Sequence, residues 1–177
     1  MKKILIAFSS VDGQTFKICN EISHILVKDG HQVDVVSINE GSKIKEDYSF
    51  ILIAASIRYG NYHKSVYKFI EDNLCTIEQT ANGFLSVSAT TRKVGRDDPL
   101  VDIYIQKIKK RSGWTPCLVK IIAGAIDYPK YKLFDRLMIQ MIMLITNGPV
   151  DTSKRFEFTN WHKVRLFSLE ISNKLKS

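Results

Sequence analysis

Few residues in this sequence are of the kinds that cross-link a fold or hold a metal. The three cysteines lie far apart and form neither a CxxC pair nor an even-numbered set. A disulfide framework is therefore not expected, and we interpret each cysteine as a small buried side chain. The four histidines show no metal-ligand spacing, so we assign no metal site. The cysteines are Cys19, Cys75 and Cys117.

Long hydrophobic runs are also missing. No stretch reaches the roughly 20 apolar residues that are needed to span a bilayer. The chain enters a strand-like run, KKILIAF at residues 2–8, without the charged and apolar regions of a signal peptide. These features predict an intracellular protein that does not span a membrane.

Acidic residues are outnumbered by basic ones. The 18 Asp and Glu residues against 26 Lys and Arg residues leave a net charge of +8, which indicates an anionic partner such as nucleic acid, a membrane surface or an acidic small molecule. The basic residues are scattered, and the one run, KIKKR at residues 107–111, is interpreted as a solvated helix end. Nucleic acid is therefore not expected as a partner.

The chain does contain enough apolar residues for a core. With 177 residues and 45% hydrophobic content, residues 1–177 are expected to form a single domain. Short apolar runs alternate with helical patterns, which predicts an α/β fold. We expect strands near residues 2–8, 31–38, 49–56, 83–90 and 118–124, and helices near residues 14–30, 64–73, 98–111 and 160–175.

These five strands predict a doubly wound, five-stranded parallel sheet. The near-continuous apolar sequence of FILIAA and VKIIAGA is typical of parallel strands that are covered on both faces. In such sheets ligands bind at the carboxyl ends of the strands, and the flavodoxin-like strand order places FMN there. The loops after the first, third and fourth strands should therefore be binding loops.

The first of these loops is FSSVDGQT, residues 8–15, which joins a strand to a helix. A helix N-terminus presents unpaired N–H groups and the positive end of a dipole, so hydroxyls and a glycine placed before it suit a bound phosphate. The alternative is that Ser10 or Asp12 only caps the helix.

The other two loops are also rich in binding chemistry. After the third strand comes ASIRYGNYH, where Ser56 and Gly60 allow a tight backbone and Tyr59 offers an aromatic face for a flat ring. After the fourth comes SVSATTRK, a second concentration of hydroxyls with Arg92 and Lys93 behind it. Each loop alone could be ordinary loop chemistry, but three at the expected strand ends favour an FMN site.

Residues 126–152 interrupt what should be the last strand, which we expect to resume at KRFEFT, residues 154–159. Within this insertion residues 133–146 are predicted to be a helix of about 21 to 24 Å, too short to span a bilayer. One side is polar, interrupted by Ile139 and Met143, and the other is strongly apolar. It could be an ordinary core helix, but the sheet has its core without it. We therefore expect its apolar side to meet a membrane, quinone, porphyrin or partner subunit.

At the level of whole motifs the chain resembles a known family. FSSVDGQT resembles the phosphate loop of flavodoxins, and ASIRYGNYH together with AGAIDYPKYKLFDRLMIQMIM resembles the menaquinone-dependent protoporphyrinogen oxidases. The resemblance covers essentially the whole chain. It implies an FMN enzyme that removes six electrons from protoporphyrinogen IX, giving protoporphyrin IX in haem synthesis, and passes them to menaquinone or another respiratory quinone. It also implies a cytoplasmic protein that is peripherally associated with the anionic inner face of the membrane.

Two other classes of function remain open, a flavodoxin-like electron-transfer protein and a basic nucleotide-binding module without redox chemistry. The basic charge and the apolar insertion argue against the first, since flavodoxin electron carriers are acidic and have little need for such a helix. Flavin content would separate the second.

The candidate site residues follow from these loops. For FMN they are Ser9, Ser10, Asp12, Gly13, Gln14, Thr15, Ser56, Ile57, Arg58, Tyr59, Gly60, Ser86, Val87, Ser88, Ala89 and Thr90. For the substrate or the membrane they are Tyr128, Lys130, Tyr131, Lys132, Arg136, Met138, Met141 and Ile142. His63 is the nearest titratable side chain to the second loop and the only candidate for a catalytic base, although a lone loop histidine is more often incidental.

Overall fold

A parallel sheet runs through the centre of the protein. The computed structural model describes residues 1–39, 42–92, 98–100 and 102–176. Five strands pair in parallel in the order β2-β1-β3-β5-β6. Their bounds are β1 Lys3–Ser9, β2 Gln32–Ser37, β3 Phe50–Arg58, β5 Ala81–Ser88 and β6 Leu118–Ala123. The predicted doubly wound parallel sheet is confirmed, and the short strand β4, Asn61–Tyr62, adds an antiparallel sixth strand by pairing with β3.

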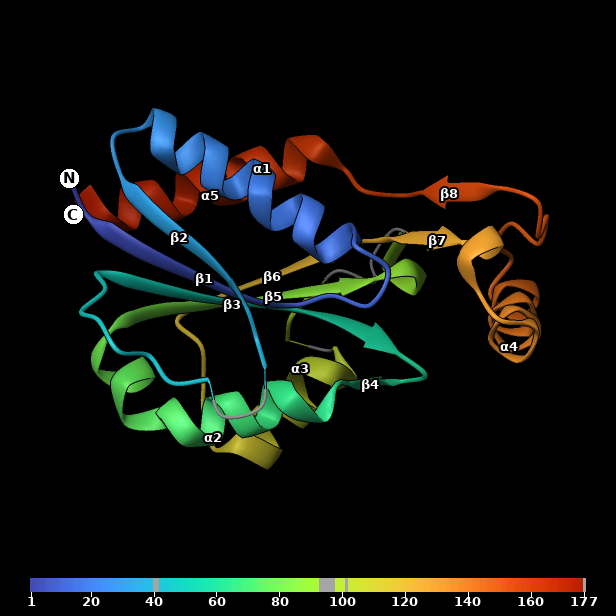
Figure 1. The fold of residues 1–177 in the computed structure, drawn as a ribbon, viewed down its shortest axis with the longest axis horizontal. Helices are drawn as coiled ribbons and strands as arrows, with labels where there is room; N and C mark the ends of the chain where they lie inside the picture. The colour runs from blue at the N-terminus through green and yellow to red at the C-terminus, as the bar shows by residue number, and fades with distance from the viewer. Residues whose placement is uncertain (40–41, 93–97, 101, 177) are drawn as a thin grey trace.

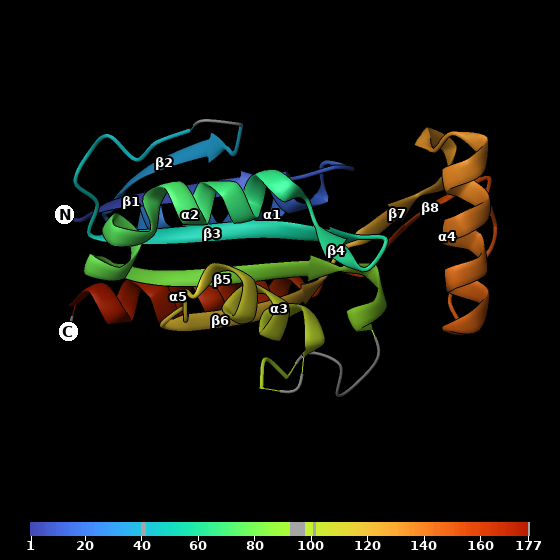
Figure 2. The same cartoon turned by 90° about the horizontal axis from the view of Figure 1, so that it is seen from below.

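Two pairs of helices cover this sheet, one pair on each face (Figures 1 and 2). The helices α1 and α5 lie on one face, and α2 and α3 lie on the other. Their bounds are α1 Gln14–Lys28, α2 Lys64–Gln79, α3 Ile103–Ser112 and α5 Trp161–Lys176. The carboxyl ends of the parallel strands are left open at one edge of this sandwich.

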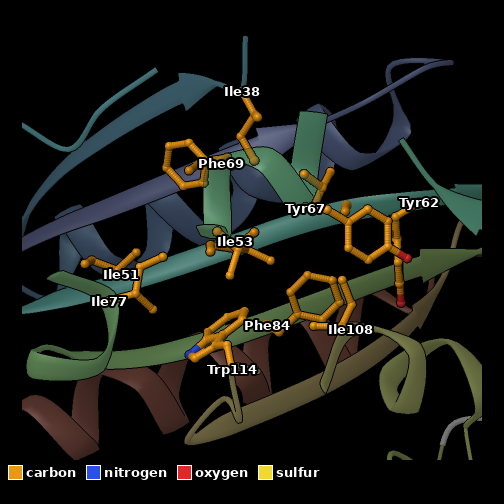
Figure 3. Close-up of a cluster of buried hydrophobic side chains, with 14 of the residues drawn as sticks. Ile38, Ile51, Ile53, Tyr62, Tyr67, Phe69, Ile77, Phe84, Ile108 and Trp114 are labelled. Carbon is orange, nitrogen blue, oxygen red and sulfur yellow. The ribbon is translucent and has the colours of Figure 1, made fainter. Parts of the chain in front are cut away.

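The alternation of side chains along β3 builds both layers of the core. Ile51 and Ile53 point into the cluster under α2 and α3, while Phe50 and Leu52 point into the cluster under α1 and α5, and all four are fully buried. Successive residues of a strand face opposite sides of a sheet, so a continuous apolar run serves a sheet that is covered twice. Figure 3 shows the first cluster.

Local capping chemistry explains where the helices begin. The residue before α1 is Gly13, at φ +83°, and no side chain caps that end, so the alternative that Ser10 or Asp12 caps the helix is wrong. The helix α3 begins at Ile103 rather than near 98, because the Asp102 carboxylate accepts the N–H groups of residues 104 and 105, both at 2.9 Å. Lys93 and Val101 lie outside the described residues. The helix α2 continues six residues beyond the predicted end at 73, to Gln79.

The cysteines are less buried than predicted. Only Cys19, on the inner face of α1, is buried, whereas Cys75 and Cys117 are exposed. Cys75 lies on the outer face of α2. Cys117 precedes β6, and its backbone N–H donates to the side-chain oxygen of Asn82 at 3.0 Å. Burial of these two was a wrong prediction, since neither side chain points into the sheet.

The insertion forms an arm that projects beyond the end of the sheet. The strand β7, Ala125–Asp127, pairs antiparallel with β8, Arg155–Glu157, in a separate two-stranded sheet. This arm carries a short 3-10 turn, η2, at Tyr128–Lys130 and the helix α4 at Leu133–Ile145. The predicted helix is confirmed to within one residue.

The prediction that the last strand of the main sheet resumes at residues 154–159 is wrong. The returning chain pairs with β7, where Ile126 lies opposite Phe156, and the Phe156 ring packs edge-on to that of Tyr128 at 6.3 Å. Because β8 runs back alongside the strand that leads out, it closes the arm as a hairpin and adds nothing to the parallel sheet.

Candidate cofactor and substrate site

A cavity of about 720 Å³ lies at the carboxyl ends of the parallel strands. It is bounded by the loop after β1 and the first turn of α1, by the loop after β3, by the loop after β5, and by β7 and α4. The predicted FMN-binding residues that line it are Ser10, Asp12, Gln14, Thr15, Ser56, Ile57, Arg58, Tyr59, Gly60, Val87, Ser88, Ala89 and Thr90.

The part of the cavity that suits a bound phosphate lies at the start of α1. The side-chain oxygens of Ser10, Thr15 and Ser56 are buried and make no hydrogen bond within the described part of the chain. A buried hydroxyl without a partner costs about 1–3 kcal/mol, and the first N–H groups of a helix are likewise left without intrahelical acceptors. Three unsatisfied hydroxyls beside such a helix end fit a ligand rich in oxygen acceptors, as a phosphorylated ribityl chain is.

The loop after β3 presents an aromatic side chain at the mouth of the cavity. It turns through Tyr59, at φ +50°, and Gly60, at φ +72°, before the short strand β4, Asn61–Tyr62, pairs back on β3. A positive φ is unfavourable for a residue with a bulky side chain, so this backbone must be held by its surroundings. The Tyr59 hydroxyl donates to the Asp135 carboxylate on α4, which holds the ring at 44% exposure beside the cavity.

The guanidinium of Arg58 links the loop between β1 and α1 to the helix α4. It lies 3.0 Å from the Asp12 carboxylate and 3.3 Å from the Asp135 carboxylate. It also lies over the rings of Tyr59 and Tyr131, at 5.3 and 5.1 Å from their centroids. Two acidic residues from distant parts of the chain therefore share one cation.

Tyr131 completes this network from the arm. Its hydroxyl donates to Asp12 at 2.7 Å. Burial, followed by the hydrogen bond to the Asp12 carboxylate, raises the pKa of Tyr131, so the phenol keeps its proton and acts as a donor at neutral pH. The Asp12 side chain is thus turned toward the arm and does not cap α1.

A second arginine holds the other end of α4. Arg92 ends the short 3-10 turn η1, Ala89–Arg92, and donates to the Ala89 carbonyl at 3.1 Å. It also donates to the backbone oxygen of Thr146, the residue that directly follows α4, at 2.8 Å. The loops after β3 and β5 are therefore each tied by an arginine to one end of the helix.

The two faces of α4 differ from the simple polar and apolar division of its sequence. The residues that interrupt the polar side, Ile139 and Met143, are the ones that pack inward, and they line the cavity together with Ile142 and Thr146. Met143 is the only fully buried side chain among the described residues of this helix. The outer face carries apolar side chains that are between 51% and 74% exposed, namely Leu133, Phe134, Leu137, Met141, Leu144 and Ile145.

The remaining predicted residues are distributed around the cavity rather than in it. Among the candidates for FMN, Ser9 ends β1, Gly13 precedes α1, and Ser86 is buried in β5, where its oxygen accepts from Tyr62 at 2.8 Å. His63 caps α2, where its ring accepts the N–H of Ser65. In the described chain His63 is not part of the cavity lining.

The predicted substrate or membrane residues divide in a similar way. Tyr131 and Ile142 line the cavity, whereas Tyr128 is fully buried and donates to the Pro149 carbonyl at 2.8 Å. The others lie on the arm away from the cavity lining: Lys130, Lys132, Arg136, Met138 and Met141.

Several lining residues were not predicted. They come from the loops after β1, β5 and β6, from the start of α3 and the segment before it, and from the arm, namely Val11, Thr91, Asp98, Asp102, Ile103, Tyr104, Gly124, Ala125, Ile126, Ile139, Met143 and Thr146. A signal existed for two of them, since Ile139 and Met143 are four residues apart and interrupt a polar helix face, which is the spacing of a second apolar contact.

The fold and these loops define a flavodoxin-like domain. A family model described as flavodoxin domain matches residues 5–153. Among solved structures, a flavodoxin from the domain Archaea has a TM-score of 0.57 at 15% identity and covers 99% of each chain. A flavodoxin from Streptococcus pneumoniae TIGR4 has a TM-score of 0.53 at 16% identity, over 97% of this chain and 99% of the other. At such low identity these structures support the fold alone.

Sequence relatives are more specific. The protoporphyrinogen IX dehydrogenase [quinone] of Escherichia coli K12 is 36% identical over 172 residues, which is 97% of this chain and 95% of that protein. The protein of the same name from Leishmania major is 34% identical, over 96% of this chain and 74% of the relative. The chain therefore belongs to the flavodoxin family and, within it, to the family of the quinone-linked protoporphyrinogen IX dehydrogenases.

Proposed function

We propose that this protein is an FMN-dependent oxidoreductase that converts protoporphyrinogen IX to protoporphyrin IX in haem biosynthesis and delivers the electrons to a quinone. The observation that carries the proposal is the cavity itself. It has three unsatisfied hydroxyls beside a helix N-terminus, and the inserted apolar helix α4 forms part of its wall. An electron carrier would need the first feature but not the second.

Different loops bind different parts of FMN. Ser10 and Thr15, with the N–H groups at the start of α1, bind the phosphate. Ser56 supplies a further hydroxyl, and Tyr59 offers its ring to the flat flavin. The hydroxyl-bearing loop Ser88–Thr90, together with Ile57, Gly60 and Val87, bounds the remainder of the site. We assign these roles to the positions predicted from the sequence.

Bound FMN supplies a two-electron acceptor. The overall reaction removes six electrons and six protons from the porphyrinogen and converts three quinones to three quinols. The chain's own side chains position the reactants and exclude water. Each carboxylate of the described lining already has a partner: Asp12 has Arg58 and Tyr131, while Asp98 and Asp102 accept backbone N–H groups. We therefore assign no protein group as a strong general base.

The outer face of α4 is proposed to rest on an anionic membrane surface at the cytoplasmic side. A helix of 13 residues is about 20 Å long, enough to lie in the interface plane. In the described part of the chain no helix is long and apolar enough to cross a bilayer. Lys130, Lys132 and Arg136 flank the apolar face and suit anionic headgroups. This placement brings the cavity close to lipid-dissolved quinone, with menaquinone as the expected acceptor.

The test is an anaerobic turnover assay. FMN-loaded protein is mixed with protoporphyrinogen IX, and porphyrin fluorescence is followed with and without a menaquinone analogue, against a protein-free control. Catalytic, quinone-dependent growth of fluorescence is expected. If the protein bound one flavin per chain but did not turn over protoporphyrinogen IX, an electron-transfer role would be favoured instead.

A further inference from the structure

Arg58 is unusual in having two carboxylate partners that belong to different parts of the site. Asp12, at 3.0 Å, lies in the loop that precedes α1, and Asp135, at 3.3 Å, lies in the first turn of α4. The side chain is held on two further sides by the rings of Tyr59 and Tyr131. It is only 22% exposed, so this is not a loose surface ion pair.

The position of Asp12 raises an electrostatic problem that Arg58 answers. Asp12 lies two residues before the start of α1 and lines the same cavity as Ser10 and Thr15. A carboxylate beside a phosphate site repels the dianion, and low-dielectric surroundings strengthen that repulsion. The guanidinium cancels the carboxylate charge at a distance of 3.0 Å, and the Tyr131 hydroxyl satisfies its other oxygen.

The second partner, Asp135, links Arg58 to α4, which forms part of the cavity wall. Asp135 receives Arg58 and the Tyr59 hydroxyl, both from the loop after β3. Loss of the cation would therefore loosen the first turn of α4 as well as leave Asp12 charged beside the phosphate site.

We propose that Arg58 is a positioning residue with two separable roles, namely to neutralise Asp12 so that the first loop accepts a phosphate dianion and to hold α4 over the cavity through Asp135. The inference rests on the proposed function, since it presumes FMN as the ligand. It assigns Asp12 to electrostatic control of the phosphate site rather than to direct contact with the cofactor.

The two roles are separated by changing the partners. Arg58→Gln leaves Asp12 uncompensated and is expected to weaken FMN binding by about tenfold or more, as loss of one charge partner at a buried anion site does. Asp12→Asn alone should strengthen FMN binding, and Arg58→Gln combined with Asp12→Asn should return it to near the wild-type value. Asp135→Asn should leave FMN affinity within about twofold, because that carboxylate lies on α4 and contacts Arg58 and Tyr59 rather than the loop that binds the phosphate.

The assay is titration of the apoprotein with FMN and, in parallel, with riboflavin, following the quenching of flavin fluorescence. Riboflavin has the same ring and ribityl chain without the phosphate, so its affinity should change little in all of these variants. Lys68→Gln is the matched control, since Lys68 pairs with Asp72 on the outer part of α2 at 2.6 Å and its loss removes a positive charge far from the cavity.

The role at α4 is measured separately, by hydrogen exchange of the α4 amides in apoprotein. Arg58→Gln and Asp135→Asn should both speed exchange in the first turns of α4, whereas Asp12→Asn should not. Arg58→Lys should keep the compensating charge and FMN affinity while speeding the exchange, because an ammonium lacks the fork that reaches two carboxylates.

Two results would overturn the inference. Equal losses of FMN and riboflavin affinity in Arg58→Gln, with no rescue by Asp12→Asn, would mean that Arg58 supports the loop only structurally. Unchanged exchange in Asp135→Asn would remove the role at α4. Both measurements are made without substrate, so a failure of porphyrinogen turnover would bear on the proposed function alone.

Discussion

The outer face of α4 allows the sharpest quantitative prediction. Leu137 and Leu144 lie one heptad apart on the same face and are 56% and 68% exposed. Complete burial of a leucine side chain is worth about 1.5–3 kcal/mol, so the exposed part of each has about 1–2 kcal/mol still to gain. Replacing both with glutamine should therefore cost about 2–4 kcal/mol of membrane binding, roughly a 30- to 700-fold fall in the partition coefficient.

The assay is co-sedimentation with vesicles of phosphatidylethanolamine and phosphatidylglycerol. Glutamine is a good helix former and both positions are outside the core, so the melting temperature should stay within a few degrees. The control changes Leu166 and Leu169 to glutamine, on the exposed side of α5 at 49% and 48% exposure. The helix α5 lies along the parallel sheet, whereas α4 lies beyond the end of the sheet (Figures 1 and 2), so this change should leave vesicle binding unchanged.

The reasoning would be refuted if the α4 variant bound vesicles as tightly as the wild type, or if the α5 control lost as much binding. If the wild type bound purely zwitterionic vesicles as tightly as anionic ones, and the α4 variant lost the same factor with both, the apolar contribution would be supported. The flanking cations would then have no role in membrane binding.

Three further predictions concern the arm and the core. Replacing residues 128–150 with a short loop should keep FMN binding, because the hydroxyl loops belong to the sheet, while abolishing porphyrinogen turnover. Gly148→Ala should lower stability by about 1–3 kcal/mol, measured by thermal unfolding, because a Cβ there would lie 2.5 Å from atoms of both Arg92 and Met143. His31 should make unfolding stability fall as the pH drops below about 6.5, because burial, opposed in part by Asp29, lowers its pKa and protonation is then easier in the unfolded chain.

Each of these has an outcome that would contradict it. Full turnover by the shortened chain would show that the arm is dispensable. An unchanged melting temperature in Gly148→Ala would mean that Arg92 moves aside without loss. For the histidine, His31→Gln is the comparison, and a wild-type stability profile parallel to that of the variant between pH 7 and 5 would exclude its contribution.

Much of the fold was accessible from local patterns. Runs of apolar residues long enough for a strand but not for a helix identified the parallel strands, and the turn chemistry of the loops between them indicated where a ligand would bind. Most of the predicted FMN loop residues do line the cavity. These features are local because strand burial and loop composition each depend on a few consecutive residues.

Other features of the structure depend on contacts between distant segments. The sequence of the arm suggested a strand that resumes, but β8 pairs with β7 because the chain turns back after α4. His63 caps α2 through Ser65, two residues away, and its role as a candidate base stays a prediction. The sequence offered Asp12 as a cap for α1 or as part of the FMN site, and only the fold brings Arg58 and Tyr131 to its two oxygens.

The sequence by itself determined the α/β class, the order of elements and the amphipathic character of α4, because each follows from residue spacing within one segment. Only the tertiary structure decided which side of α4 faces the protein. Pairs such as Arg58 with Asp135 and Arg92 with Thr146 turn the polar side inward, and the larger apolar side is left exposed. Such ion pairs and hydrogen bonds join residues more than 50 positions apart, and no periodicity within a single helix encodes them.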